Sequence, residues 1–120
     1  VTGQTIVHFD TPQLPSISKE KAATSDSCVL RFRSEFNNAT IWIDSPDKNR
    51  DFTVASTNLS VAFATSVTVK KRIGDKIHIT IAGSTFSFTL LKEYMFIDID
   101  YKKDTNTVDI YYSNNILVLS

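Results

Sequence analysis

Alternation of apolar and polar residues along the chain is the feature that most restricts its fold. Across residues 76–81, Ile77, Ile79 and Ile81 alternate with polar residues. Side chains at every second position of a β-strand share one face, so this spacing predicts a strand with one buried side. The same period recurs over 28–33, 41–44, 86–90, 97–101 and 108–112. One apolar and one polar face per strand is typical of antiparallel sheets, and the chain is therefore predicted to be all-β.

The segments that connect the predicted strands contain residues that favour turns. Gly74 and Gly83 each lie between two strand candidates, and residues 102–106 join the two most regular ones. Strands at intervals of about 8–12 residues are typical of a sandwich or a barrel. We expect a two-layer antiparallel β-sandwich of roughly seven to nine strands, with an immunoglobulin-like or transthyretin-like architecture. The cysteine pair of immunoglobulin domains is missing, because Cys28 is the only cysteine.

The length and the proline positions define the expected domain organisation. The chain has 120 residues, which fits one domain over 1–120. The segment at about 10–27 contains Pro12, Pro15 and many small polar residues. Proline fixes its own φ and restricts the residue before it, so we expect a long irregular connection there. Residues 5–9 are expected to form a first strand, and 18–23 one helical turn.

The charge balance excludes some classes of partner. The chain has 13 basic and 13 acidic residues, and its formal net charge is zero. Nucleic-acid binding depends on a basic field that neutralises phosphates, so we expect no nucleic-acid partner. No apolar run approaches the ~20 residues that a membrane-spanning helix needs. We therefore expect a chain that does not span a membrane.

The sequence contains no recognisable catalytic, metal or cofactor motif. Its two histidines, His8 and His78, are far apart, and Cys28 alternates with core residues. A zinc site needs further nitrogen, sulfur or carboxylate ligands, and nothing in the sequence marks them. The three glycines form neither a phosphate-binding loop nor a nucleophile elbow. We expect no enzyme, no cofactor and no metal.

Three carboxylates, Asp98, Asp100 and Asp109, lie on the polar side of two neighbouring strand candidates. If those strands pair, the three side chains share the solvent face of one sheet. Oxygen ligands that lie close together suit Ca²⁺. Alternatively, Lys102, Lys103 or basic groups on a neighbouring strand offset the repulsion between like charges without a metal. We favour the second interpretation.

Aromatic residues also occur on the polar side of the alternation. Trp42, Phe96 and Tyr111 each lie next in the sequence to a residue that is expected in the core. Because successive side chains of a strand point to opposite faces, these three aromatic residues are expected to face outward. Tryptophan and tyrosine are favoured anchors of protein interfaces, although an outer face covered by the 10–27 connection would make them a second core layer. We predict a binding surface that consists of Trp42, Phe96, Asp98, Asp100, Asp109 and Tyr111.

These observations favour a non-enzymatic protein-interaction or adhesion/structural module of a secreted or cell-envelope protein. Glycosylation sequons at Asn38 and Asn58 agree with that location. The chain begins at Val1 rather than methionine, so we expect a removed leader or an excised domain. The expected partner is another protein or a cell-surface component. The alternative function is a carrier of a small apolar ligand in a β-sandwich or barrel cavity.

Overall fold

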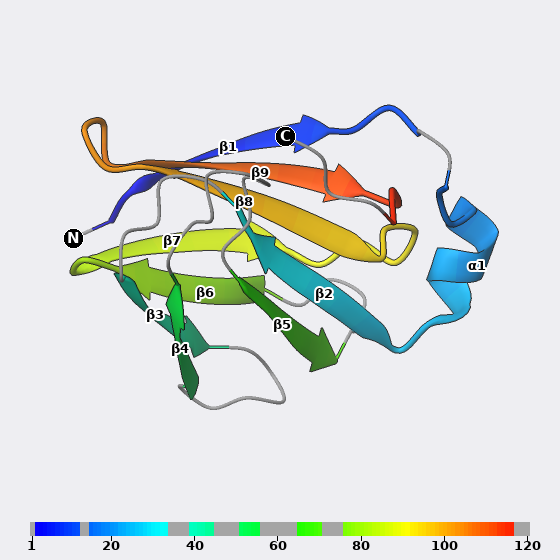
Figure 1. Cartoon of the computed structure of the whole chain (residues 1–120), viewed down its shortest axis with the longest axis horizontal. Coiled ribbons are helices and arrows are strands. Elements are labelled where there is room, and N and C mark those ends of the chain that lie inside the picture. Colours follow the sequence, from blue (N-terminus) through cyan, green and yellow to red (C-terminus); the bar gives the residue numbers. More distant parts are fainter. Residues whose placement is uncertain are drawn as a thin grey trace.

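The computed structural model describes residues 2–12, 15–33, 39–44, 51–55, 65–70 and 76–116. These residues form nine strands and one short helix, α1 (Lys19–Thr24), in the connection between the first two strands (Figure 1). The strands are β1 (Gln4–Phe9), β2 (Ser27–Phe32), β3 (Ala39–Asp44), β4 (Asp51–Ala55), β5 (Thr65–Lys70), β6 (Lys76–Ile81), β7 (Ser84–Thr89), β8 (Phe96–Lys102) and β9 (Thr107–Ser113).

The strands form two sheets, which confirms the expected all-β sandwich. One sheet has five strands in the order β1-β9-β8-β2-β5, and the other has four in the order β4-β3-β6-β7.

The sequons at Asn38 and Asn58 lie outside the described residues. No helix in the described part of the chain is both long and apolar enough to cross a bilayer.

The four-stranded sheet is antiparallel throughout, as expected, but the five-stranded sheet is mixed. Its strands β1 and β9 are parallel, and so are β2 and β8. The alternation of side chains shows which face of a strand is buried. A strand has the same alternation whether its neighbour is parallel or antiparallel, so the pattern does not predict the direction of the neighbour. Because these parallel partners are far apart in the sequence, no short turn fixes their relative direction.

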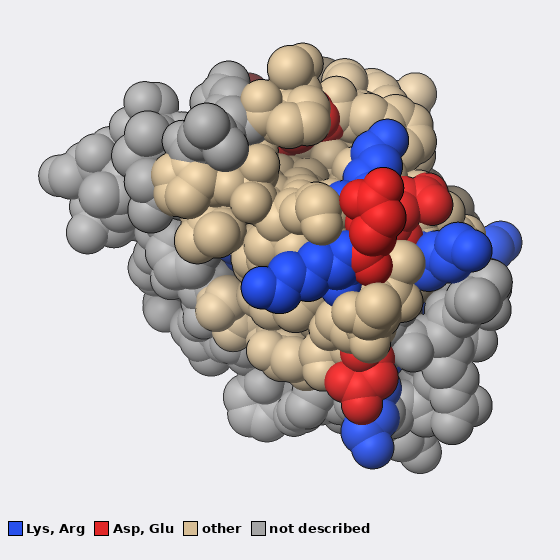
Figure 2. All heavy atoms as spheres, turned by 90° about the vertical axis from the view of Figure 1, so that its right-hand side faces the viewer, with Lys and Arg blue, Asp and Glu red and all other residues tan. Residues whose placement is uncertain are grey.

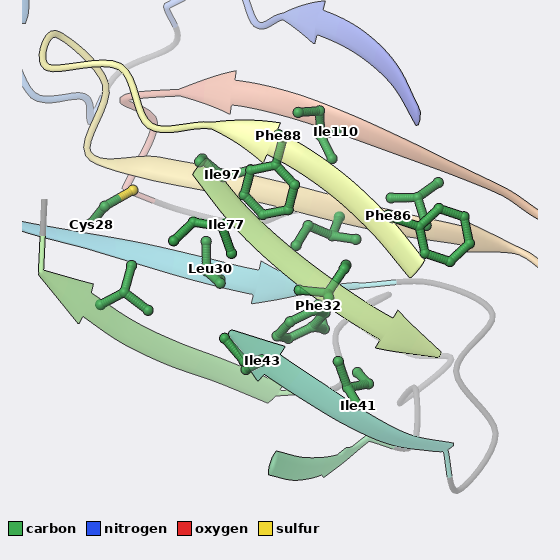
Figure 3. Close-up of a cluster of buried hydrophobic side chains, with 14 of the residues drawn as sticks. Cys28, Leu30, Phe32, Ile41, Ile43, Ile77, Phe86, Phe88, Ile97 and Ile110 are labelled. Atoms are coloured by element: carbon green, nitrogen blue, oxygen red, sulfur yellow. The ribbon is translucent and has the colours of Figure 1, made fainter. Parts of the chain in front are cut away.

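The core lies between the two sheets and is built from the alternating residues. Leu30 and Ile97 of the five-stranded sheet and Ile43 and Ile79 of the four-stranded sheet are fully buried in it. Figure 3 shows side chains from both sheets directed into this common layer. Cys28 is buried among them as a small hydrophobic residue, as its spacing in the sequence predicts.

Local signals account for the hairpin turns and the helix. Ala82 and Gly83 have φ values of 51° and 80°, and two successive positive φ values are typical of the tight turn between antiparallel strands. The helix begins after Ser18, whose Oγ accepts a hydrogen bond from the Lys21 N–H at 3.2 Å. The predicted helical turn is confirmed. Strand β4 was not predicted, because its first residue, Asp51, ends a run of polar residues after Pro46 that is typical of a turn, and the four residues that remain are too few to show a clear alternation.

A close contact joins the two sheets at the start of β1. The Gly3 N–H donates to the Thr85 carbonyl at 2.9 Å, and Thr2 pairs with Thr85. A Cβ atom on Gly3 would lie 2.1 Å from Cε1 of Phe86. Glycine is therefore required here by the packing of the Phe86 ring against the backbone.

Candidate functional site

The structure brings five of the six predicted site residues together. Phe96, Asp98 and Asp100 lie on β8, beside Asp109 and Tyr111 on β9. Asp98 is directly opposite Tyr111 in the register, and Asp100 is opposite Asp109.

Trp42 is separate from the other five residues. It lies on β3, in the other sheet, between the inward-facing Ile41 and Ile43. The expected single surface is corrected in this respect. The alternation shows that Trp42 faces outward, but it does not show which of the two sheets carries its strand.

Two of the carboxylates are buried rather than exposed. Asp98 is 3% exposed and Asp109 is 4% exposed, so the expected solvent-facing acidic cluster is corrected for both. Each carboxylate is paired with cations instead, as the second interpretation of the cluster requires. Within the described residues, no three metal-ligating side chains gather at one point.

Asp98 forms a buried ion pair with Arg31 of the adjacent strand β2. Arg31 Nε donates to Oδ1 of Asp98, and Nη2 donates to Oδ2 at 3.0 Å. The guanidinium carbon lies 4.0 Å from the centre of the Phe96 ring, and Nη1 donates to the Asn115 carbonyl at 2.9 Å. Burial raises the pKa of Asp98 above its ordinary value, an effect that the hydrogen bonds and positive charge of Arg31 only partly offset. Both predicted site residues therefore contact Arg31: Asp98 through the ion pair and Phe96 through its ring.

Asp109 is held by one basic side chain from each side. His8 Nε2 lies 3.1 Å from Oδ1, and Lys102 Nζ lies 2.9 Å from Oδ2. Burial by itself would raise the pKa of Asp109, but the hydrogen bonds from Lys102 and His8 outweigh it and lower the pKa. The His8 ring also stacks on Tyr111, with 4.5 Å between ring centres. The aromatic pair therefore covers the carboxylate on the outer face of the sheet.

Edge strand β1 directs half of its backbone groups away from the sheet. The N–H group of Gln4 donates to the carbonyl of Asn106, just before β9, at 3.1 Å, and that of Asp10 donates to the carbonyl of Tyr112 in β9 at 2.9 Å. In a parallel ladder, every second residue bonds the same neighbour, so the even-numbered residues of β1 bond β9. The odd-numbered residues Thr5, Val7 and Phe9 direct their N–H and C=O groups outward.

Apolar side chains are exposed along the same edge. Val7 is 48% exposed and Phe9 is 60% exposed. Phe9 packs against Tyr112 and Tyr94, with ring centres 5.2 Å and 5.7 Å apart. We define the β1 edge as Thr5, Val7 and Phe9 together with the His8–Tyr111 pair. Sequence reasoning missed this site, although the run Ile6-Val7-His8-Phe9 breaks the alternation and is apolar on both faces of the strand.

Comparison with known proteins adds no relationship to this geometry. No family model, curated protein or solved structure matches the chain. The function must therefore be inferred from the site itself.

The charges around α1 do not form a field of one sign. Figure 2 shows basic and acidic side chains side by side on that face. Lys19, Glu20 and Lys21 are all exposed on the helix. A polyanion needs a continuous basic surface, and this mixed face does not supply one.

Replacing Asp109 with asparagine should alter the response of the protein to acid. The lowered pKa of Asp109 means that its ionised form stabilises the fold above its ordinary pKa of 3.8, and that this contribution is lost as the pH falls further. We expect Asp109→Asn to be less stable than wild type at about pH 5, and the difference to shrink towards about pH 2. Denaturant unfolding at a series of pH values measures the difference.

Asp104→Asn is the matched control, because Asp104 is exposed in the turn between β8 and β9. It removes one negative charge without breaking the His8–Asp109–Lys102 cluster. A difference for Asp109→Asn that stays constant across the acid range would contradict the assigned role of the carboxylate.

Proposed function

We propose that this protein is a non-enzymatic protein-interaction or adhesion module of a secreted or cell-envelope protein. Its partner is another protein, and an extended segment of that partner pairs with strand β1. The observation that carries the proposal is the edge position of β1, whose only neighbouring strand among the described residues is β9, with Val7 and Phe9 exposed on it.

An open edge of this kind is an unusual feature in a β-protein. Natural sheets protect their edges with lysine, proline, bulges or covering segments, because unpaired backbone groups recruit other strands. Residues 4–9 of β1 contain neither lysine nor proline. Strand addition supplies affinity through main-chain hydrogen bonds and specificity through alternate side chains. Val7 and Phe9 would contact apolar side chains of the added strand at every second position.

The His8–Tyr111 pair would contact the other face of the added strand. Its rings are stacked, and Asp109 holds the imidazole from below. Tyrosine is a frequent anchor in protein interfaces, because it buries a large apolar area and keeps a polar end. A partner strand on β1 would therefore meet apolar contacts on one side and a mixed aromatic and polar surface on the other.

Carriage of an apolar ligand between the sheets gains no support from the described residues. Side chains of both sheets that face the interior, such as Phe32 and Phe86, are fully buried in one hydrophobic cluster. We therefore retain one function.

Replacing Val7 with proline tests the proposal. Val7 directs its N–H out of the sheet, so proline removes a donor for the partner while the bonds to β9 remain. Wild type should capture a defined protein from envelope and soluble extracts of the source cell, and Val7→Pro should lose that protein. Val7→Thr keeps both the N–H group and the shape of the side chain, and it should retain capture. Mass spectrometry identifies what each variant captures.

Amide hydrogen exchange supplies a second measurement. In the free protein, the amides of Thr5, Val7 and Phe9 should exchange faster than those of Ile6 and His8. In the complex, the fast set should become protected. Capture that persists in Val7→Pro, or a complex that leaves the fast amides unprotected, would overturn strand addition at β1.

A further inference from the structure

We infer that a hollow on the outer face of the four-stranded sheet is a binding site for one sugar ring of a glycan. This site lies in the other sheet from the β1 edge and does not depend on the proposed function. The hollow has a volume of about 200 Å³, and the described residues that line it are Trp42, Ile43, Asp44, His78, Thr80 and Thr85.

Three neighbouring strands position these side chains. Trp42 of β3 is opposite Thr80 of β6, and Asp44 is opposite His78 in the same strand pair. Thr85 follows on β7, opposite Thr80. β3, β6 and β7 lie beside one another in Figure 1. Because residues opposite one another in a sheet share a face, the indole, the carboxylate, the imidazole and two hydroxyls converge on one hollow.

Hydrogen bonds hold several of these groups in place. Nδ1 of His78 lies 2.7 Å from Oγ of Ser87, which fixes the imidazole plane and leaves the Nε2 edge to meet a ligand. The hydroxyls of Thr80 and Thr85 are 3.3 Å apart. A site on strands with side chains already oriented loses little conformational freedom when a ligand binds.

The chemistry of the lining favours a neutral molecule with several hydroxyl groups. The flat, apolar indole of Trp42 fits the C–H face of a pyranose ring. Asp44 accepts hydrogen bonds from ligand hydroxyls, and His78 and the threonines can donate or accept them. The carboxylate of Asp44 disfavours phosphate and other anions.

The size of the hollow sets the size of the ligand. Pockets for drug-sized molecules have volumes of roughly 300–1,000 Å³, so a hollow of about 200 Å³ accommodates a single ring. The indole and the hydrogen-bonding groups lie on the surface of a sheet, and the neighbouring units of a glycan would extend from the hollow into solvent.

Titration with a panel of methyl pyranosides tests the inference. The panel contains the methyl glycosides of glucose, galactose, mannose and N-acetylglucosamine, and inositol is the non-pyranose comparison. Trp42 is the only tryptophan of the chain, so its fluorescence reports directly on the hollow. We expect a saturable change with at least one glycoside in the millimolar range, as suits so small a ligand.

Variants identify the site. Asp44→Ala and His78→Ala should each weaken binding about tenfold, because each removes a hydrogen bond to the ligand. Trp42→Phe keeps an aromatic face and should retain weaker binding, whereas Trp42→Ala should lose it, as measured by nuclear magnetic resonance of the glycoside. Lys76→Ala is the control, because Lys76 lies on the same strand as His78 but outside the hollow.

Two results would overturn the inference. One is the absence of a saturable response to every glycoside, which identifies the hollow as an ordinary polar sheet face. The other is binding that Asp44→Ala and His78→Ala leave unchanged. Val7→Pro should keep sugar binding, so a failure of strand addition at β1 and a failure of this site are distinguishable.

Discussion

Replacing Arg31 with methionine should lower the free energy of unfolding by about 3–5 kcal/mol. The variant leaves Asp98 buried without its bidentate partner, and it removes a donor from the carbonyls of Asn115 and Ile116. The remaining cation, Arg33, lies 3.9 Å from Oδ2 of Asp98 and does not replace the two hydrogen bonds of Arg31. A buried charge that loses its hydrogen-bonding partner costs far more than a lost surface contact, because the low-dielectric interior does not solvate it. Denaturant unfolding of wild type and variant measures the change.

The pH dependence of this variant provides an independent check. Burial already raises the pKa of Asp98, and removal of Arg31 eliminates the main effect that lowers it. A carboxyl group with a raised pKa favours the folded state when it is protonated, and that contribution is lost as the pH rises through its folded-state pKa. The cost of Arg31→Met should therefore be smaller in acid than at neutral pH.

Two further variants control for charge and volume. Lys102→Met breaks the partly exposed pair with Asp109 and should cost less than about 1 kcal/mol. The double variant Arg31→Met/Asp98→Leu removes both buried charges and should recover much of the stability. A cost below about 1 kcal/mol for Arg31→Met alone would contradict the role assigned to the pair.

Replacing Phe86 with alanine should destabilise the protein by about 3–5 kcal/mol. The ring is fully buried, meets Tyr101 edge-on at 6.3 Å between ring centres, and covers the backbone at Gly3. Its loss leaves a cavity where the two sheets meet at β1 and β7. Unfolding by denaturant, followed by fluorescence of the single tryptophan, gives the free energy.

The same ring explains why position 3 is glycine, and a double-mutant cycle tests that explanation. Gly3→Ala alone should cost about 1–3 kcal/mol, because the added Cβ overlaps the ring of Phe86. In the Phe86→Ala background the same change should cost almost nothing. Phe88→Ala is the comparison. Phe88 is also buried in the core, but the three atoms nearest to a Cβ on Gly3 all belong to Phe86. An equal cost of Gly3→Ala in all three backgrounds would contradict the contact.

The alternation of the sequence was sufficient to predict which side of most strands is buried. Ile77, Ile79 and Ile81 face the core as their spacing predicts, and Ile97 and Ile99 do the same on β8. The turn at Ala82–Gly83 and the helix start at Ser18 were also predictable. These features depend on steric and hydrogen-bonding preferences within a few residues, so a local pattern contains them.

The candidate sites were only partly predictable. Tyr111 and Asp109 were predicted to lie on an outer face, but the strand that covers them comes from the opposite end of the chain. His8 reaches Asp109 across 101 positions in the sequence. The exposure of Val7 and Phe9 depends on β1 being an edge strand, and strand order has no local signal.

The sequence by itself therefore determined the fold class, the inward face of the strands and the local turns of this protein. The tertiary structure alone decided that β1 runs parallel to β9 and β2 parallel to β8, that Trp42 and Tyr111 lie in different sheets, and that Asp98 is buried. The physical reason is the range of the interactions. Alternation follows from the geometry of a single strand, whereas strand order and the pairing of buried charges depend on contacts between segments that only the whole fold brings together.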